Sequence, residues 1–134
     1  MLVAHKFIEK LIIKMKTQVQ KGKILEDYVA KQIRDKNIDP KAYPSHGSGS
    51  SPTEKGDIWT SMMILGLNAG IECKNHKTLH IPDWWEQTKK LQNLGREPVL
   101  VYKINHAPFG DTLCTIYFDT LLEMIKEIKY LNNK

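Results

Sequence analysis

The chain has 134 residues, a length that fits one domain built around a single hydrophobic core. Its hydrophobic content of 41% and charged content of 26% are ordinary for a globular protein, and no apolar run approaches the roughly 20 residues of a membrane-spanning helix. The net charge is +5, and residues 1–23 account for all of it, with six lysines against one glutamate. Such a concentrated positive field suits a polyanionic partner such as nucleic acid, although a solvated lysine face on a surface helix explains it equally well.

The two cysteines, Cys73 and Cys114, have neither the spacing of a disulfide framework nor that of a metal site. No signal peptide is visible, because charged residues interrupt the first apolar cluster. We therefore expect a reducing, cytoplasmic setting with no membrane partner. Cys114 is expected to fill the core.

Residues 4–20 and residues 23–37 each carry apolar side chains at helical spacing, which predicts two amphipathic helices. The first helix is basic, and three roles remain open for it: packing on the domain, pairing with a second subunit, or lying along DNA. Gly22 is expected to separate the helices, which predicts a helical extension of residues 1–21 ahead of a domain of residues 22–134. Glu26 lies at the edge of the second apolar stripe, where a glutamate that snorkels to solvent and a site residue are both possible.

Residues 44–56 are rich in Gly, Ser and Pro, which predicts a loop that either connects two elements or offers hydroxyl and amide groups to phosphate. Residues 57–65 and 69–75 are expected to be the two strands of a β-hairpin, with Gly66, Asn68 and Gly70 in the turn. The segment around Tyr43 is expected to form a weak strand before them.

Residues 83–94 are expected to form a helix that Gly95 ends, with Gln87 as an unusual polar group on its inward face. The full inward stripe would be Trp84, Gln87, Thr88, Leu91 and Leu94. Residues 98–104 and 112–118 are expected to be interior strands. A last helix would begin at Asp119 with a capping box from Thr120 to Glu123. This order of elements predicts an α/β sandwich around a mixed sheet.

Three charged residues stand out on the expected hairpin. Glu72 and Lys74 share one face of their strand, because side chains alternate, and Asp57 lies across from them if the chain turns near Leu65 and Gly66. Burying these charges without compensation would be costly. A salt bridge would satisfy Glu72 and Lys74 but would leave Asp57 alone, whereas a divalent cation satisfies both carboxylates. The lysine would then orient the attacking water or stabilise charge on a phosphate.

The run from Gly56-Asp57 to Glu72-Cys73-Lys74 resembles the PD-(D/E)xK nuclease signature, with Gly56 in place of the proline. Its surroundings resemble archaeal-type Holliday junction resolvases over residues 22–104. The shared order is a helix with Gly22-x-x-x-Glu26, a Gly/Ser loop, the charged hairpin and a later helix with Gln87. One departure is the absence of an arginine just ahead of the loop, where this chain reads AYPSHGSGS.

The resemblance implies a restriction-endonuclease-like core, a mixed sheet flanked by helices, with the amino-terminal helix as an addition. It also implies a crossover junction endonuclease, which cuts four-way DNA junctions by metal-activated water and uses Mg²⁺ or Mn²⁺. Because resolving a junction needs two symmetric cuts, this function implies a C2 homodimer. Asp57, Glu72, Glu26 and the Cys73 carbonyl would hold the ion, Lys74 would act on the attacking water, and Gln87 would hydrogen-bond near the site. The implied DNA contacts are Ser48, Ser50, Lys55, Lys21, Lys23, His76 and Lys77.

Two other interpretations remain open. One is a general or sequence-specific endonuclease of restriction or phage DNA-processing type, which the missing arginine leaves in contention. The other is a non-catalytic DNA-binding module with the same fold, which the complete set of Asp57, Glu72 and Lys74 argues against.

Overall fold

The computed structural model describes residues 18–45 and 56–133, and for the first two of these it describes the backbone alone. The expected basic helix of residues 4–20 therefore lies almost wholly outside the described residues. The same holds for Ser48, Ser50 and Lys55, three of the expected DNA contacts.

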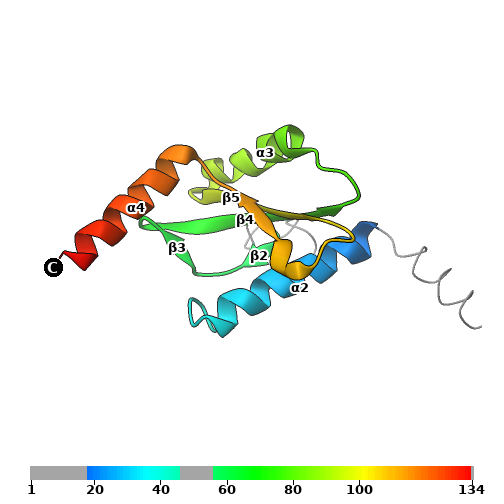
Figure 1. Cartoon of the computed structure of the whole chain (residues 1–134), viewed down its shortest axis with the longest axis horizontal. Coiled ribbons are helices and arrows are strands. Elements are labelled where there is room, and N and C mark those ends of the chain that lie inside the picture. Colours follow the sequence, from blue (N-terminus) through cyan, green and yellow to red (C-terminus); the bar gives the residue numbers. More distant parts are fainter. Residues whose placement is uncertain (1–17, 46–55, 134) are drawn as a thin grey trace, which may run out of the picture.

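A four-stranded mixed sheet forms the centre of the molecule, in the order β3-β4-β5-β6. The strands are β3 (Met63–Ile64), β4 (Leu67–His76), β5 (Glu97–Ile104) and β6 (Leu113–Thr115). The two long strands, β4 and β5, run parallel, while β3 and β6 pair antiparallel on the outside. Helix α2 (Gln18–Asp35) lies on one face of the sheet and α3 (Ile81–Lys89) on the other (Figure 1). The expected α/β architecture with a mixed sheet between helices is confirmed.

Alternation along β4 divides its side chains between two cores. Ile71 and Cys73 point toward α2 and join Leu25, Val29 and Ile33 in the larger hydrophobic cluster. The opposite face of the sheet packs against α3. There Trp84 is buried beside Leu100 and Tyr102 of β5. Both clusters bury large apolar side chains, which is the main source of free energy holding the helices to the sheet.

Helix α2 begins at least five residues earlier than expected, because Gly22 lies inside it and does not separate two helices. A single glycine in a helix costs only about 1 kcal/mol relative to alanine, and the packing of Leu25, Val29 and Ile33 offsets that cost. The division into an extension of residues 1–21 and a domain of residues 22–134 stays a prediction.

The expected strand of residues 57–65 is wrong in its middle, because the chain leaves the ladder at residues 60–62. Two short strands remain: β2 (Ile58–Trp59), which pairs with β1 (Tyr43–Pro44), and β3. The buried Asp39 carboxylate causes the break, since it accepts hydrogen bonds from Thr60 Oγ1 at 2.7 Å and from the Ser61 N–H at 2.9 Å.

The hairpin turn itself is confirmed at Leu65 and Gly66, both with positive φ, as a two-residue hairpin loop requires. Asn68 and Gly70, expected in the turn, belong to β4. After β4, α3 starts at Ile81 and continues as the 3-10 helix η1 (Lys90–Leu94). Gly95 ends it in the left-handed conformation, as expected.

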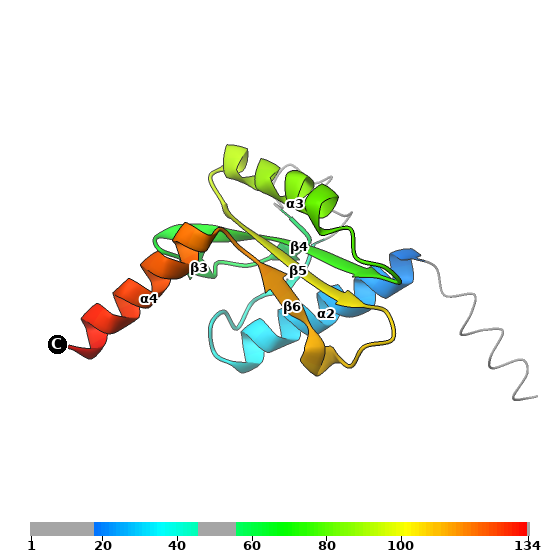
Figure 2. The same cartoon turned by 45° about the horizontal axis from the view of Figure 1, so that its top comes forward.

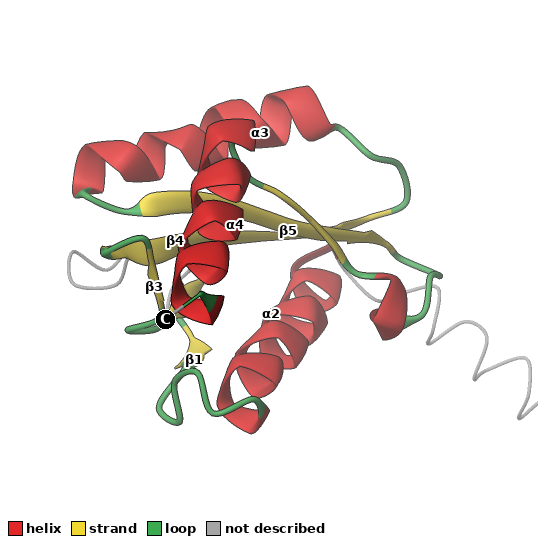
Figure 3. Cartoon of the chain, turned by 60° about the vertical axis from the view of Figure 1, so that its left-hand side comes forward, coloured by secondary structure: helices red, strands yellow, loops and turns green. Residues whose placement is uncertain are grey.

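The carboxyl-terminal part departs most from expectation. After the 3-10 helix η2 (Phe109–Asp111), strand β6 covers only three residues at the edge of the sheet, and Cys114 is exposed instead of filling the core. Helix α4 (Phe118–Asn132) extends away from the sheet (Figure 2), and it stands in front of the strands when that side of the molecule faces the viewer (Figure 3). Its expected capping box is absent, because the Thr120 hydroxyl donates to Glu97 Oε1 at 2.6 Å. Within the described ranges, no helix has both the length and the apolar character needed to cross a membrane.

Candidate active site

Asp57 lies beside β4, along the part of its edge that β3 does not pair with. Its N–H donates to the Ile71 carbonyl at 2.7 Å, and its Oδ2 accepts the Cys73 N–H at 2.8 Å. This close approach depends on Gly56, whose φ is +83°. A Cβ at Gly56 would lie 2.6 Å from the Ile71 carbonyl oxygen, closer than real Cβ contacts allow. The glycine in place of the signature's proline therefore has a local structural reason.

Glu72 and Lys74 lie on the α3 face of β4, as the alternation predicts. Their register partners on β5 are Leu100 and Tyr102, which belong to the core under α3. The Glu72 carboxyl lies close enough to that of Asp57 for the two acids to affect each other's surroundings directly. Burial raises the pKa of Glu72 strongly, the charge and hydrogen bond of Asp57 raise it further, and Lys74 opposes both effects.

Glu26 reaches the same place from α2 and is half-buried. Burial, followed by the charges of Asp57 and Asp27, raises the pKa of Glu26 to about 7, while Lys23 opposes the rise. The charge of Glu26 also acts on Glu72. Asp57 stands at the strand edge, between the two faces of the sheet, and so brings together an acid from α2 and an acid from β4.

This set of donors suits a divalent cation that keeps most of its water. Within residues 18–45 and 56–133, no three His, Cys, Asp or Glu side chains are grouped closely enough to hold a metal by themselves. Two touching carboxylates fit Mg²⁺, which binds through one or two carboxylates and fills its shell with water and phosphate oxygens. The pKa values of Glu26 and Glu72 are raised first by burial and then by the charge of Asp57, a combination that is common at functional sites.

Cys73 faces Asp57 with its backbone, while its side chain lies in the core. Its side chain is packed in the core under α2, and burial, with the charges of Asp57, Glu26 and Glu72, raises the pKa of its thiol well above the usual value. A raised pKa makes a cysteine inert as a nucleophile. The Cys73 N–H points to the edge that Asp57 occupies, and the carbonyl of an extended residue faces the same edge as its N–H.

Gln87 does not occupy the expected position. It is exposed on α3, and no hydrogen bond described for residues 18–45 and 56–133 joins it to the acids. The inward face of α3 is narrower than the sequence suggests, with Trp84 and Thr88 buried and Leu94 half exposed. The prediction of Gln87 on a buried face is wrong, and its part in the site stays a prediction.

The expected DNA contacts at the start of α2 and the end of β4 lie close together. The Lys21 carbonyl accepts a hydrogen bond from Asn75 Nδ2 at 2.9 Å, which fixes the first turns of α2 beside β4. The ring of His76 lies 4.9 Å from that of Trp84, centroid to centroid, at an interplanar angle of 48°. Burial, followed by the charges of Lys74, His80 and Lys21, lowers the pKa of His76. Lys23 and Lys77 are exposed nearby. The hydrogen bond from Asn75 and the effect of Lys21 on His76 place the start of α2 beside the end of β4, and we call the positions Lys21, Lys23, His76 and Lys77 there the basic surface.

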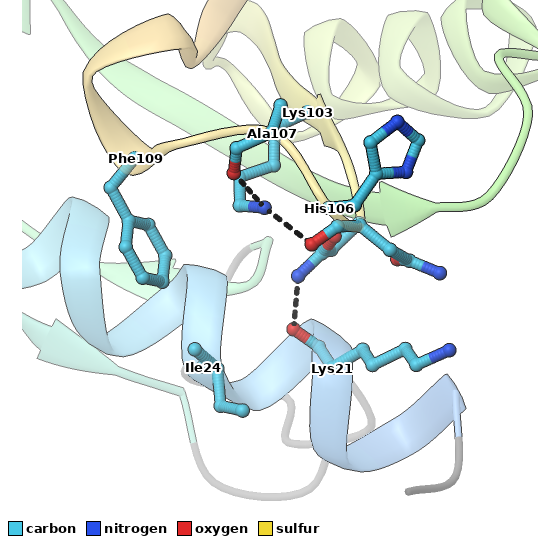
Figure 4. A pocket seen from close by; sticks show the side chains of 8 residues that line it. Lys21, Ile24, Lys103, His106, Ala107 and Phe109 are labelled. Atoms are coloured by element: carbon cyan, nitrogen blue, oxygen red, sulfur yellow. Dashed lines mark hydrogen bonds between the residues drawn. The ribbon is translucent and has the colours of Figure 1, made fainter. Parts of the chain in front are cut away.

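A hollow of about 440 Å³ opens beside this surface, between α2 and the turn after β5 (Figure 4). Lys21, Lys103 and His106 line it with cationic or titratable groups. The buried Lys103 ammonium donates to three carbonyls of the turn at 2.8–3.0 Å, so it holds the turn in place. His106 is exposed at the rim. Nothing in the sequence marks Lys103 or His106, because only the β4-β5 pairing brings them near Lys21.

Three comparisons with known proteins bear on this site. The model of a family described as "Phage putative PDDEXK endonuclease" matches residues 17–132. The match includes Glu26, Asp57, Glu72 and Lys74. No curated protein and no solved structure gave a significant match.

Proposed function

Because this chain belongs to the phage PDDEXK endonuclease family, we propose that it is a divalent-cation-dependent DNA endonuclease. It would hydrolyse phosphodiester bonds at the site formed by Asp57, Glu72 and Lys74. The observation that carries the proposal is the contact between the Asp57 and Glu72 carboxyls, with Lys74 on the same strand face. Two acids are held together at a cost, and a cation between them would remove that cost.

The residues of this chain would share the work as follows. Asp57 and Glu72 would hold the cation, the Cys73 carbonyl would add a backbone oxygen, and Glu26 would act on the site from the α2 side. When bound, Mg²⁺ or Mn²⁺ lowers the pKa of water and neutralises charge on the scissile phosphate. Lys74 orients the attacking water or stabilises the charge that develops on the phosphate.

The DNA would lie across the basic surface that begins at Lys21 and Lys23 and continues to His76 and Lys77. Ser48, Ser50 and Lys55 would contact phosphates from the Gly/Ser loop, and Gln87 would act from α3. Lysines at such a surface fix the backbone of the nucleic acid without reading its sequence. The site therefore suits selection of DNA by shape.

We propose four-way junctions as the preferred substrate and a homodimer as the working unit, because the order of Glu26, Asp57, Glu72 and Lys74 along the chain resembles that of junction resolvases. The second candidate is an endonuclease that cuts duplex DNA during phage DNA processing. The family membership favours this candidate equally.

The deciding experiment is a cleavage panel with labelled four-way junction, duplex, flap and single-stranded DNA. Each substrate is incubated with Mg²⁺, Mn²⁺ or chelator. We expect metal-dependent cutting that both Asp57→Asn and Glu72→Gln abolish and that Glu86→Gln, an exposed acid-to-amide change on α3, leaves intact. Selective cutting of the junction supports the resolvase, and equal cutting of duplex supports the second candidate. Cleavage that survives both site variants would overturn the nuclease site.

A further inference from the structure

Helix α4 exposes an apolar side that no part of the described chain covers. Four residues on it are 41–70% exposed although all are large and hydrophobic: Phe118, Leu121, Ile125 and Ile128. No residue of α4 is buried, and only Thr120 and Met124 are half-buried. Exposed apolar residues are common when scattered, but a continuous stripe along a helix marks a surface that binds something.

The spacing of the stripe indicates what binds. Phe118, Leu121, Ile125 and Ile128 follow one another at intervals of three, four and three residues. This is the heptad repeat by which helices pack against other helices, and Asn132 continues it with the polar residue that often fixes register. Two heptads of such a stripe can pack against the same stripe of a second α4 helix.

The charges and the area of α4 also favour a like partner. The helix carries three acids and two lysines, so it is unsuited to bind a polyanion, and a second α4 would meet it without strong repulsion. The exposed parts of the stripe and Leu122 amount to about 500 Å² of apolar surface per copy. Two copies would bury about 1,000 Å² of it, which reaches the lower size of a specific interface.

The neighbouring sheet edge belongs to the same uncovered side. β6 pairs only with β5 among the described strands, and its Leu113 is 55% exposed. Open strand edges in native proteins are usually covered or blunted. Since α4 follows β6 by two residues, a partner on α4 lies next to this edge.

We propose that α4 is the docking surface for a second copy of this chain, with the stripe of Phe118, Leu121, Ile125 and Ile128 packed against the same stripe of its partner. Such a contact is isologous and closes into a C2 dimer. This contact supplies the interface of the homodimer that we propose for the nuclease. The inference rests on the proposed function only in expecting that two copies act together.

The test measures mass, not activity, so a failed interface and a failed nuclease are distinguishable. Sedimentation equilibrium of the full chain from about 1 to 100 µM compares the wild type with Ile125→Glu and Leu121→Glu. The control is Tyr130→Glu, another exposed hydrophobic residue, which lies about 140° around the helix from Ile125. Far-UV circular dichroism and thermal unfolding verify that each variant is folded.

We expect twice the 15.5 kDa chain mass for the wild type and for Tyr130→Glu. Each stripe variant should weaken dimerisation at least 100-fold, because an unpaired buried carboxylate enters the interface twice. A monomeric wild type that sediments with anionic vesicles would overturn the proposal in favour of a membrane surface. Loss of the dimer on deletion of residues 1–17 would overturn it in favour of the amino-terminal segment. A dimer that persists in both stripe variants also contradicts it.

Discussion

The Cys73 N–H donates to Oδ2 of Asp57 across 2.8 Å, so the strand that carries Glu72 also fixes the other carboxylate of the site. Asp57 is thereby both a structural acceptor and a candidate metal ligand. These two roles can be separated, because an amide keeps a carbonyl oxygen for the N–H but loses the negative charge.

We predict that Asp57→Asn leaves the fold stable and lowers cleavage by on the order of 10²–10³-fold, since an amide binds Mg²⁺ poorly. Asp57→Ala should be equally inactive and also less stable by about 1–2 kcal/mol, because it leaves the Cys73 N–H without its acceptor. Urea unfolding and single-turnover cleavage measure the two effects. DNA affinity at fixed salt should stay equal or rise, because the change removes a charge that repels phosphate. Equal stability of Asp57→Asn and Asp57→Ala would show that the hydrogen bond from the Cys73 N–H does not stabilise the fold.

Glu72→Gln should stabilise the metal-free protein. Its carboxyl is largely buried beside that of Asp57, so a neutral amide removes both the cost of burying the acid and the repulsion from Asp57, together worth on the order of 1 kcal/mol. In chelator we expect a melting temperature a few degrees above that of the wild type. Addition of millimolar Mg²⁺ should raise the melting temperature of the wild type but not that of the variant. Glu86→Gln, on the exposed side of α3, is the matched control. If Glu72→Gln melts below the wild type in chelator, the Glu72 carboxyl does not destabilise the metal-free protein and the prediction is wrong.

Periodicity allowed β4, β5 and the helix of residues 23–37 to be predicted, because apolar residues at a spacing of two or of about 3.6 indicate one buried face of a strand or helix. The break between β2 and β3 could not be predicted this way. It depends on Asp39, which lies 21 residues before Thr60 and is brought beside it only by the fold. Likewise, α4 has the pattern of a helix buried on one face, and that pattern does not say whether its own chain or another molecule covers it.

Some parts of the candidate site could likewise be predicted from the sequence, and others could not. Glu72 and Lys74 were predictable from strand alternation. Asp57 lies beside β4 as expected, but through a parallel bridge of Gly56 with Ile71 and not through a continuous antiparallel hairpin. The coupling of Glu26 to these acids needs the packing of α2 against β4, which the resemblance implied and spacing alone did not establish. Gln87 fits a helical stripe by spacing, yet α3 turns it to solvent, because Trp84 and Thr88 already fill the contact with the sheet.

The two glycines Gly56 and Gly66 offer a matched pair for testing the close approach of Asp57 to β4. Both have a φ near +85°, but a Cβ at Gly66 meets nothing within 4 Å, whereas at Gly56 it meets the Ile71 carbonyl oxygen at 2.6 Å. Gly66→Ala should cost about 1–2 kcal/mol from backbone strain alone. Gly56→Ala should cost at least about 2 kcal/mol more and should also reduce cleavage, because Asp57 moves away from Ile71.

Urea unfolding of the two alanine variants gives the difference between them. Gly56→Pro, which would restore the proline of the signature, should fail to fold stably, since proline fixes φ near −65°. Equal costs at the two glycines would mean that β4 moves to accept the Cβ. The close packing of Gly56 on Ile71 would then not be what positions Asp57.

Asp39 should make stability depend on pH. Its buried carboxylate accepts three hydrogen bonds, from Thr60 Oγ1, the Ser61 N–H and the Lys41 N–H at 3.0 Å, and the bond from Thr60 contributes most to lowering its pKa below 3.8. A carboxyl whose folded pKa is lowered stabilises the protein above its unfolded pKa, and the stabilisation is lost as pH falls through the folded pKa. Asp39→Asn should therefore cost about 1.5–3 kcal/mol at pH 7 and progressively less as the pH falls below 3.8. Urea unfolding of wild type, variant and the exposed-site control Asp111→Asn at pH 7, 5 and 3 measures this. A cost that is the same at pH 3 and pH 7 would mean that the shape of the hydrogen-bonded turn, and not the charge, holds β2 and β3 apart.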